Sequence, residues 1–163
     1  MPLALHLLIH FSLSILSGYI VGRYFKNIWL GIIAGFLGGF LIDLDHVLEY
    51  FFILGAHFNL YYFLTGRQFL KSDRIYIIFH AWEYIAPLLG LAWLLEKKKT
   101  LKIFLISLAF AASVHLVSDA LINNYPFKFY SIIYRSEQSF AAPRLLSPGQ
   151  WTRNLELKAS LGL

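Results

Sequence analysis

Four long apolar runs dominate this sequence, at residues 3–22, 28–48, 75–95 and 101–122, and the second can be extended to residue 54. Each is about as long as the roughly 20 residues that a helix needs to cross a bilayer. Backbone groups in lipid must be hydrogen-bonded within the protein, and these runs are too long and too unpatterned for barrel strands. We therefore expect an all-α integral membrane bundle of four transmembrane helices.

The composition agrees with a membrane location. Hydrophobic residues make up 58% of the 163 residues and charged residues 14%, against roughly 45–50% and 25% in soluble domains. A soluble chain this short leaves too much surface exposed to hide so many apolar side chains. The net charge is +5, but the basic residues lie between and after the apolar runs. This placement favours anionic membrane lipids over nucleic acid as the partner, and we expect the cytoplasmic (inner) membrane of a prokaryote.

Two segments outside the runs have mixed character. Residues 56–74 combine aromatic and basic side chains, which is typical of a segment in the headgroup interface. Residues 123–163 begin with several aromatic residues and contain Pro126, Pro143 and Pro148, which disfavour a long helix. We expect a four-helix transmembrane metal-site domain at 1–122 and an interfacial or extramembrane C-terminal tail at 123–163.

Ionisable residues recur inside the apolar runs, where each costs about 2.5–3.5 kcal/mol at mid-depth and usually marks function. In a serpentine of four helices, they would lie near the helix ends on one side of the membrane, so we expect one polar layer. The set comprises His10 in the first run, Asp43, Asp45 and His46 in the second, His80 in the third, and His115 and Asp119 in the fourth.

This donor set is suited to a divalent metal. The chain has no Cys, so imidazole and carboxylate must supply the ligands, a combination that suits Zn, with Mn or Fe as alternatives. We predict that all the residues of this set bind metal, and that Glu83 or Asp43 serves as a base. His6 lies one turn nearer the chain end and can be interfacial, and Glu49 suits either the site or its rim. A metal-activated water would then attack an ester, most plausibly a phosphoester of a lipid or another small molecule.

The same residues carry a resemblance to a known family. His10, the stretch Leu41-Ile42-Asp43-Leu44-Asp45-His46, His80, and the stretch His115-Leu116-Val117-Ser118-Asp119 resemble the membrane-bound metal-dependent hydrolases of the YdjM (LexA-regulated inner-membrane) type. That family is distantly similar to the zinc-dependent phospholipase C and P1-type nuclease group, so the resemblance implies a hydrolase. The chain departs from the family pattern at Ile42, where Pro is usual, and at Phe79-His80-Ala81-Trp82-Glu83, where a Thr-His-Ser element is usual.

Other functions remain open at this stage. A metal-ion or proton transporter would need polar residues along the whole bundle, and the stretches 13–22 and 88–95 offer few. A haem-binding bundle is less suited to paired carboxylates, and a purely structural membrane protein would leave the polar residues unexplained. Basic residues in the loops opposite the polar layer favour a site that faces outward.

Overall fold

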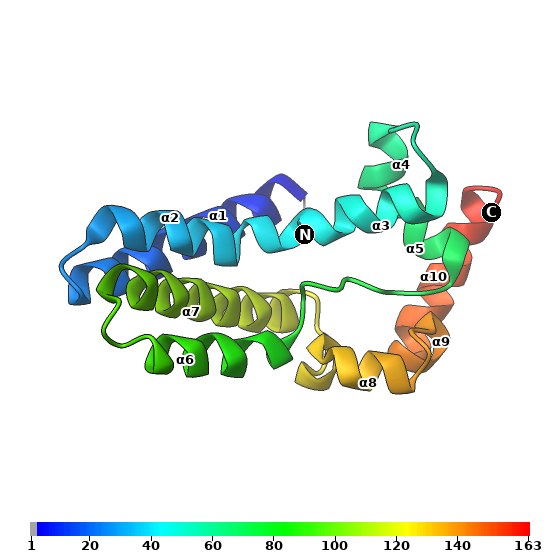
Figure 1. Ribbon diagram of the computed structural model, residues 1–163. Helices are drawn as coiled ribbons and strands as arrows, with labels where there is room; N and C mark the ends of the chain where they lie inside the picture. Colours follow the sequence, from blue (N-terminus) through cyan, green and yellow to red (C-terminus); the bar gives the residue numbers. More distant parts are fainter. Residues whose placement is uncertain (1–2) are drawn as a thin grey trace. The chain divides into compact units, whose positions relative to one another are not determined.

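The computed structural model describes residues 3–163, and its regular elements are helices (Figure 1). Contacts between residues divide the chain into two compact units, each built from two stretches of sequence. Unit 1 contains residues 3–42 and 81–127, and unit 2 contains residues 43–80 and 128–163. The predicted all-α class is therefore confirmed, and each unit can be described by itself.

Unit 1 is a helical bundle. It contains α1 (Leu3–Tyr24), α2 (Ile28–Gly39), α6 (Ile85–Leu94) and α7 (Lys99–Ile122). The helices α1, α2 and α7 pack against one another, and α6 lies along α7 (Figure 1). Asn27 begins α2, because its side chain accepts a hydrogen bond from the backbone N–H of Leu30. Such a cap satisfies one of the backbone donors that a helix leaves unpaired at its start.

Glycine allows the helices of unit 1 to approach closely. A Cβ added at Gly35 would lie 2.6 Å from the Cα of Gly18, and one added at Gly38 would lie 2.4 Å from the carbonyl oxygen of Leu108. Helix association in lipid depends on such close packing rather than on hydrophobic burial, which favours small residues at the contacts. The glycines thus fix the spacing of α1, α2 and α7.

Three helical stretches of the described chain are long and apolar enough to cross a membrane: Leu5–Tyr24, Ile28–Leu54 and Lys99–Ile122. The second comprises α2, a short 3-10 turn at Leu41–Asp43, and α3 (Leu44–Leu54). These stretches confirm long apolar helices at the first, second and fourth apolar runs. Large apolar side chains remain exposed along unit 1, as lipid-facing surfaces require; examples are Leu8, Leu16, Trp29, Ile33, Trp93 and Leu121.

The third run does not form a spanning helix, so the prediction of four transmembrane helices was wrong. Residues 75–81 form no helix and include a turn at residues 78–79, Trp82–Tyr84 is a 3-10 turn, and α6 has only 10 residues. At 1.5 Å per residue α6 is about 15 Å long, half the thickness of the hydrocarbon core. The physical reason lies in unit 2, where side chains take the backbone hydrogen bonds of residues 76–80 that a helix would have made.

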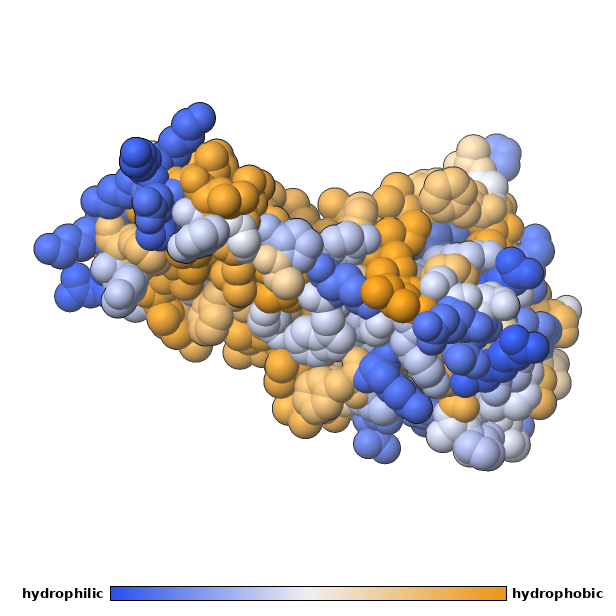
Figure 2. All heavy atoms as spheres, turned by 60° about the horizontal axis from the view of Figure 1, so that its bottom comes forward, coloured by the Kyte–Doolittle hydropathy of each residue, from blue (hydrophilic) through white to orange (hydrophobic). Residues whose placement is uncertain are grey.

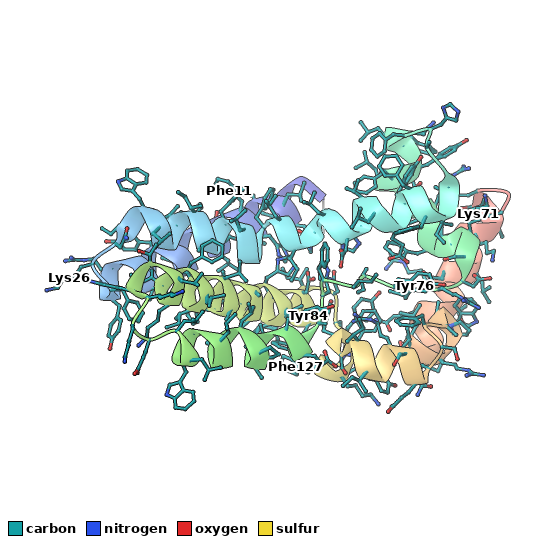
Figure 3. The ribbon with its side chains drawn as sticks, in the orientation of Figure 1. Phe11, Lys26, Lys71, Tyr76, Tyr84 and Phe127 are labelled. Atoms are coloured by element: carbon teal, nitrogen blue, oxygen red, sulfur yellow. The ribbon has the colours of Figure 1, made fainter. Side chains whose placement is uncertain are left out.

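Basic residues gather at one end of unit 1. Arg23 in the last turn of α1 and Lys26 in the α1–α2 loop are exposed, as are Lys97 and Lys98 before α7 and Lys99 at its start. Figure 2 shows hydrophilic surface at this end and hydrophobic surface along the helices next to it. Lys26 is labelled in this loop in Figure 3. Positive loops favour the cytoplasmic side of a membrane.

Unit 2 consists of short helices around an extended segment. It contains α3, α4 (Leu60–Leu64), α5 (Arg67–Ser72), α8 (Ile132–Glu137), α9 (Ala142–Leu145) and α10 (Pro148–Ser160). An isolated antiparallel bridge pairs Arg74 with Ala141, and the Lys158 ammonium lies 2.7 Å from the Asp73 carboxylate. The extended segment, residues 73–80, therefore lies in the middle of this unit (Figure 1).

The tail contains no long helix, as its prolines predict. Pro143 and Pro148 stand in the first turns of α9 and α10, where the missing N–H of proline costs nothing. Ser147 and Gln150 form a capping box that begins α10. The longest helix of the tail, α10, has 13 residues. The interfacial location of residues 56–74 and of the tail stays a prediction.

Candidate metal centres

The first candidate centre, cluster 1, lies in unit 1 and consists of His6, His10, His115 and Asp119. His6 and His10 are one turn apart on α1, and His115 and Asp119 are one turn apart on α7. This spacing places each pair on one helix face. His10, His115 and Asp119 are buried, and the side chain of His6 is 21% exposed.

The imidazoles of cluster 1 surround the Asp119 carboxylate. Oδ1 lies 3.2 Å from His10 Nε2 and 3.6 Å from His6 Nε2, and Oδ2 lies 3.4 Å from His115 Nε2. One possible ligand atom from each of His6, His10 and Asp119 can be chosen so that all lie within 4.8 Å of one another. The described part of unit 1 therefore offers at least three converging donors for one cation.

Cluster 1 also contains a close contact between two imidazoles. His115 Nδ1 is within hydrogen-bond distance of both the Gly39 carbonyl oxygen and His10 Nδ1. A carbonyl can only accept, so the tautomer of His115 with its proton on Nδ1 suits Gly39. In that tautomer Nε2, which lies 3.4 Å from Asp119 Oδ2, would offer a lone pair to a cation.

The second candidate centre, cluster 2, lies in unit 2 and consists of Asp43, Asp45, His46 and His80. Asp43 precedes α3, Asp45 and His46 lie in its first turn, and His80 ends the extended segment. His80 Nδ1 is 2.9 Å from Asp45 Oδ2, and His80 Nε2 is 3.2 Å from Asp43 Oδ1. His46 Nε2 is 3.7 Å from the same Asp43 oxygen.

Within cluster 2, Asp45 orients His80 and Asp43 faces it from the other side. Asp45 Oδ2 also accepts hydrogen bonds from the backbone N–H groups of Phe79 and His80. Donation of one imidazole N–H to such a carboxylate is how proteins fix the tautomer of a metal-binding histidine. The lone pair of His80 Nε2 then lies beside His46 and Asp43. The side chains of these two residues are 32% and 19% exposed, so small molecules can reach this centre.

Two buried side chains hold the extended segment that carries His80. The Glu49 carboxylate accepts from the backbone N–H groups of Tyr76 and Ile77, each at 3.0 Å. The Arg135 guanidinium donates to the carbonyl oxygens of Ile77 and His80, each at 3.0 Å, and to that of Phe129. Figure 3 labels Tyr76 on this segment. Buried backbone groups need such partners, so Glu49 and Arg135 replace the hydrogen bonds of a helix.

The backbone at Ile77 is strained. Its φ is +30°, outside the ordinary regions for a β-branched residue. Such a conformation costs on the order of 1–3 kcal/mol and persists only where the surroundings impose it. At Ile77 the N–H is bound by Glu49 and the carbonyl by Arg135. The strain therefore lies three residues before a histidine of cluster 2.

The structure assembles the predicted ligands in two groups. His10, His115 and Asp119 meet in unit 1, and Asp43, Asp45, His46 and His80 meet in unit 2. Their roles as ligands, and the prediction that all of them share one layer, stay predictions. Glu83, the other predicted base, is half-buried in the 3-10 turn before α6 and belongs to none of the possible ligand groups found among the described residues.

Three residues that the sequence patterns did not single out contribute to the two clusters or to the segment that carries His80. His6 joins cluster 1, and its i,i+4 spacing from His10 was the available signal. Glu49 binds backbone rather than lining a solvated rim, and it is only 3% exposed. Arg135 is fully buried although it lies in a polar part of the tail, and no local pattern marks it.

Comparison with known proteins adds no further constraint: no family model, curated protein or solved structure matches the chain. The buried His/Asp clusters and the three potential membrane helices are therefore the features on which a function can be argued.

Proposed function

We propose that this protein is an integral membrane hydrolase that uses divalent metal ions held by His and Asp to cleave an ester, most plausibly a phosphoester. The observation that carries the proposal is the convergence of imidazole nitrogens and carboxylate oxygens in both clusters. Nitrogens of the buried His80 and His115 lie 3.2–3.4 Å from carboxylate oxygens. A cation held between such donors would offset the cost of burying them.

We assign the ligand and orienting roles to the two clusters as follows. In cluster 2, His46, His80 and Asp43 would hold the cation, while Asp45 orients His80. In cluster 1, His6, His10, His115 and Asp119 would hold another, and all four donors are nitrogen or oxygen, which suits Zn, with Mn or Fe as alternatives. The metal would supply Lewis acidity that brings the pKa of water near 7.

A carboxylate must then take the proton from the attacking water. Asp43 is the stronger candidate, because it is partly exposed and lies beside His46 and His80. Glu83 is the second candidate. A base within hydrogen-bond reach of the water contributes typically 10²–10⁴-fold to such a reaction. Because Asp43 is also a proposed ligand of this cation, substitution of Asp43 by Asn should lower both the hydrolysis rate and the metal content.

The proposed substrate is a lipid phosphoester in the inner membrane of a prokaryote. Three helices can place the chain in a bilayer, and cluster 2 is partly open, as a catalytic metal site requires. The resemblance of the D-x-D-H and H-x-x-x-D stretches to the YdjM-type hydrolases points the same way. The site facing outward, away from the basic loops, is part of this proposal.

Metal content is the decisive measurement. We expect the purified protein to contain Zn or Mn in stoichiometric amount, and His115→Ala and His80→Ala each to lower that amount. His57→Ala is the matched control, because His57 is exposed and only its backbone carbonyl is bound, by Tyr50. Wild-type protein without any bound metal after mild purification, or equal loss in the His57 control, would refute the proposal.

Activity and its rivals are tested on the same preparations. Phosphodiester and phospholipid hydrolysis should stop on chelation and return on readdition of metal. Flux of metal or protons through proteoliposomes that is lost in His115→Ala, without hydrolysis, would instead support a transporter. A visible Soret absorption would indicate haem.

A further inference from the structure

Unit 2 contains a cavity of about 570 Å³ beside cluster 2. Most of its wall is apolar and comes from α3 and the extended segment; it includes Leu48, Phe52, Ile53, Ile78 and Phe79. Its volume lies within the roughly 300–1,000 Å³ typical of small-molecule sites. The cavity is therefore large enough for part of a lipid.

The cavity borders cluster 2 through Asp45. This residue lines the cavity, and its Oδ2 holds Nδ1 of His80 at 2.9 Å. Its other oxygen, Oδ1, is buried and has no hydrogen-bond partner among the described residues. A buried carboxylate oxygen without a partner is costly. A ligand that brings a hydroxyl or ammonium donor to this corner would remove that cost.

The charge of the cavity selects among apolar ligands. Its acidic residues are Asp45 and Glu49, and the Glu49 oxygens already accept from the backbone N–H groups of Tyr76 and Ile77. Two carboxylates in its lining disfavour the carboxylate of a free fatty acid by like-charge repulsion. They are compatible with a lipid whose headgroup carries an ammonium or a hydroxyl.

The helix that forms the wall belongs to a potential membrane span. Leu48, Phe52 and Ile53 lie within the stretch Ile28–Leu54, and Leu48 and Phe52 are 46% and 81% exposed. A concave apolar surface on a membrane-embedded helix meets acyl chains as its solvent. Both the expected membrane environment and the apolar lining of the cavity therefore favour an acyl chain as its occupant.

We propose that this cavity binds an acyl chain of a zwitterionic or hydroxyl-bearing glycerolipid, such as phosphatidylethanolamine, with the polar end of the lipid at Asp45 and cluster 2. This inference rests on the proposed function in its choice of a lipid as substrate. It adds the subsite that holds the apolar part and the headgroup class.

The test is photolabelling of full-length protein in detergent micelles. The probe is phosphatidylethanolamine with a diazirine on one acyl chain, added below the protein concentration, and labelled peptides are mapped by mass spectrometry. We expect label on residues 44–54 and 75–80, displaced by unlabelled phosphatidylethanolamine and not by oleate. Leu48→Trp fills the cavity and should weaken labelling about tenfold.

The control variant is Ile33→Trp, which adds the same side chain to an exposed position of α2 that does not line the cavity. It should label as the wild type does. Label spread evenly over the apolar helices, or equal competition by oleate, would overturn the inference. The competition experiment uses wild-type protein, so it tests the inference even if Leu48→Trp does not fold. Labelling is measured with and without chelator, independently of hydrolysis. Specific labelling without hydrolysis would leave the lipid site standing and count against the hydrolase, whereas hydrolysis without specific labelling would count against the lipid site.

Discussion

The two clusters of histidine and aspartate are built on different kinds of backbone. Cluster 1 stands on two regular helices, α1 and α7, with its residues one turn apart. Cluster 2 stands on the start of α3 and on an extended segment whose hydrogen bonds go to Glu49, Asp45 and Arg135. Helices satisfy their own backbone and need only small residues to pack. The extended segment depends on buried charged side chains, so unit 2 should be far more sensitive to single polar substitutions.

The largest effect is expected for Arg135→Met. The substitution leaves the buried carbonyl groups of Ile77, His80 and Phe129 without their donor, and each buried acceptor left unsatisfied costs about 1–3 kcal/mol. We expect rapid hydrogen exchange at residues 75–80 and loss of the metal bound by cluster 2. Arg135→Lys should restore only part of the protection, since one ammonium cannot reproduce the planar fork. Unchanged exchange in Arg135→Met would contradict the role of the guanidinium.

A test of unit 1 is Gly35→Ala. The new Cβ would meet the Gly18 backbone at 2.6 Å, and overpacking of this kind costs about 1–3 kcal/mol. Gly90→Ala in α6 is the matched control, because nothing lies within 4 Å of its Cβ position. It should stabilise by about 0.5–1 kcal/mol through helix propensity. Thermal unfolding in detergent measures both, and equal effects would show that the helices are not in tight contact.

A smaller effect concerns Tyr125, which follows α7. Burial, and then the negative charge of Asp119, raise the pKa of its phenol above the ordinary value of 10.0. A raised pKa in the folded state means that its contribution to stability is present below pH 10 and is lost as pH rises toward the folded pKa. Ultraviolet titration of the metal-free protein, in which no cation offsets the charge of Asp119, should show Tyr125 ionising at higher pH than exposed tyrosines. Asp119→Asn should bring the midpoint down, and an unchanged midpoint would remove Asp119 as a cause.

The smallest effect is expected at the surface of unit 2. The ion pair between Lys158 and Asp73 is 2.7 Å long, but the two side chains are 24% and 44% exposed. Partly exposed pairs of this kind contribute about 0–1 kcal/mol and are screened by salt. Lys158→Ala should therefore change the unfolding free energy by less than 1 kcal/mol, with the difference vanishing at high salt. A loss of stability comparable to that of Arg135→Met would contradict the expectation that the exposed ion pair contributes much less to stability than the buried Arg135.

Much of unit 1 could be predicted from the sequence because its helices form from local features, namely long apolar runs and i,i+4 spacing. The structure has long apolar helices that could span a membrane at the first, second and fourth apolar runs, as the sequence predicts. The i,i+4 pair His115 and Asp119 lies on one face of α7. The third apolar run failed because its composition resembles a membrane helix. Its conformation depends on Glu49 and Arg135, which are 27 and 58 residues away from their partners Tyr76 and Ile77. No local pattern reports such distant partners.

The shortness of α6 has a consequence for the bilayer itself. A segment of about 15 Å beside longer helices creates a hydrophobic mismatch, which a membrane accommodates by thinning or by admitting water at the short end, at a cost of fractions of a kcal/mol per ångström. With unit 1 in a bilayer, the lipid next to α6 would be deformed by this mismatch. Bilayers with shorter acyl chains should accept the protein at lower cost, so chain length becomes a variable through which a membrane can sort this protein.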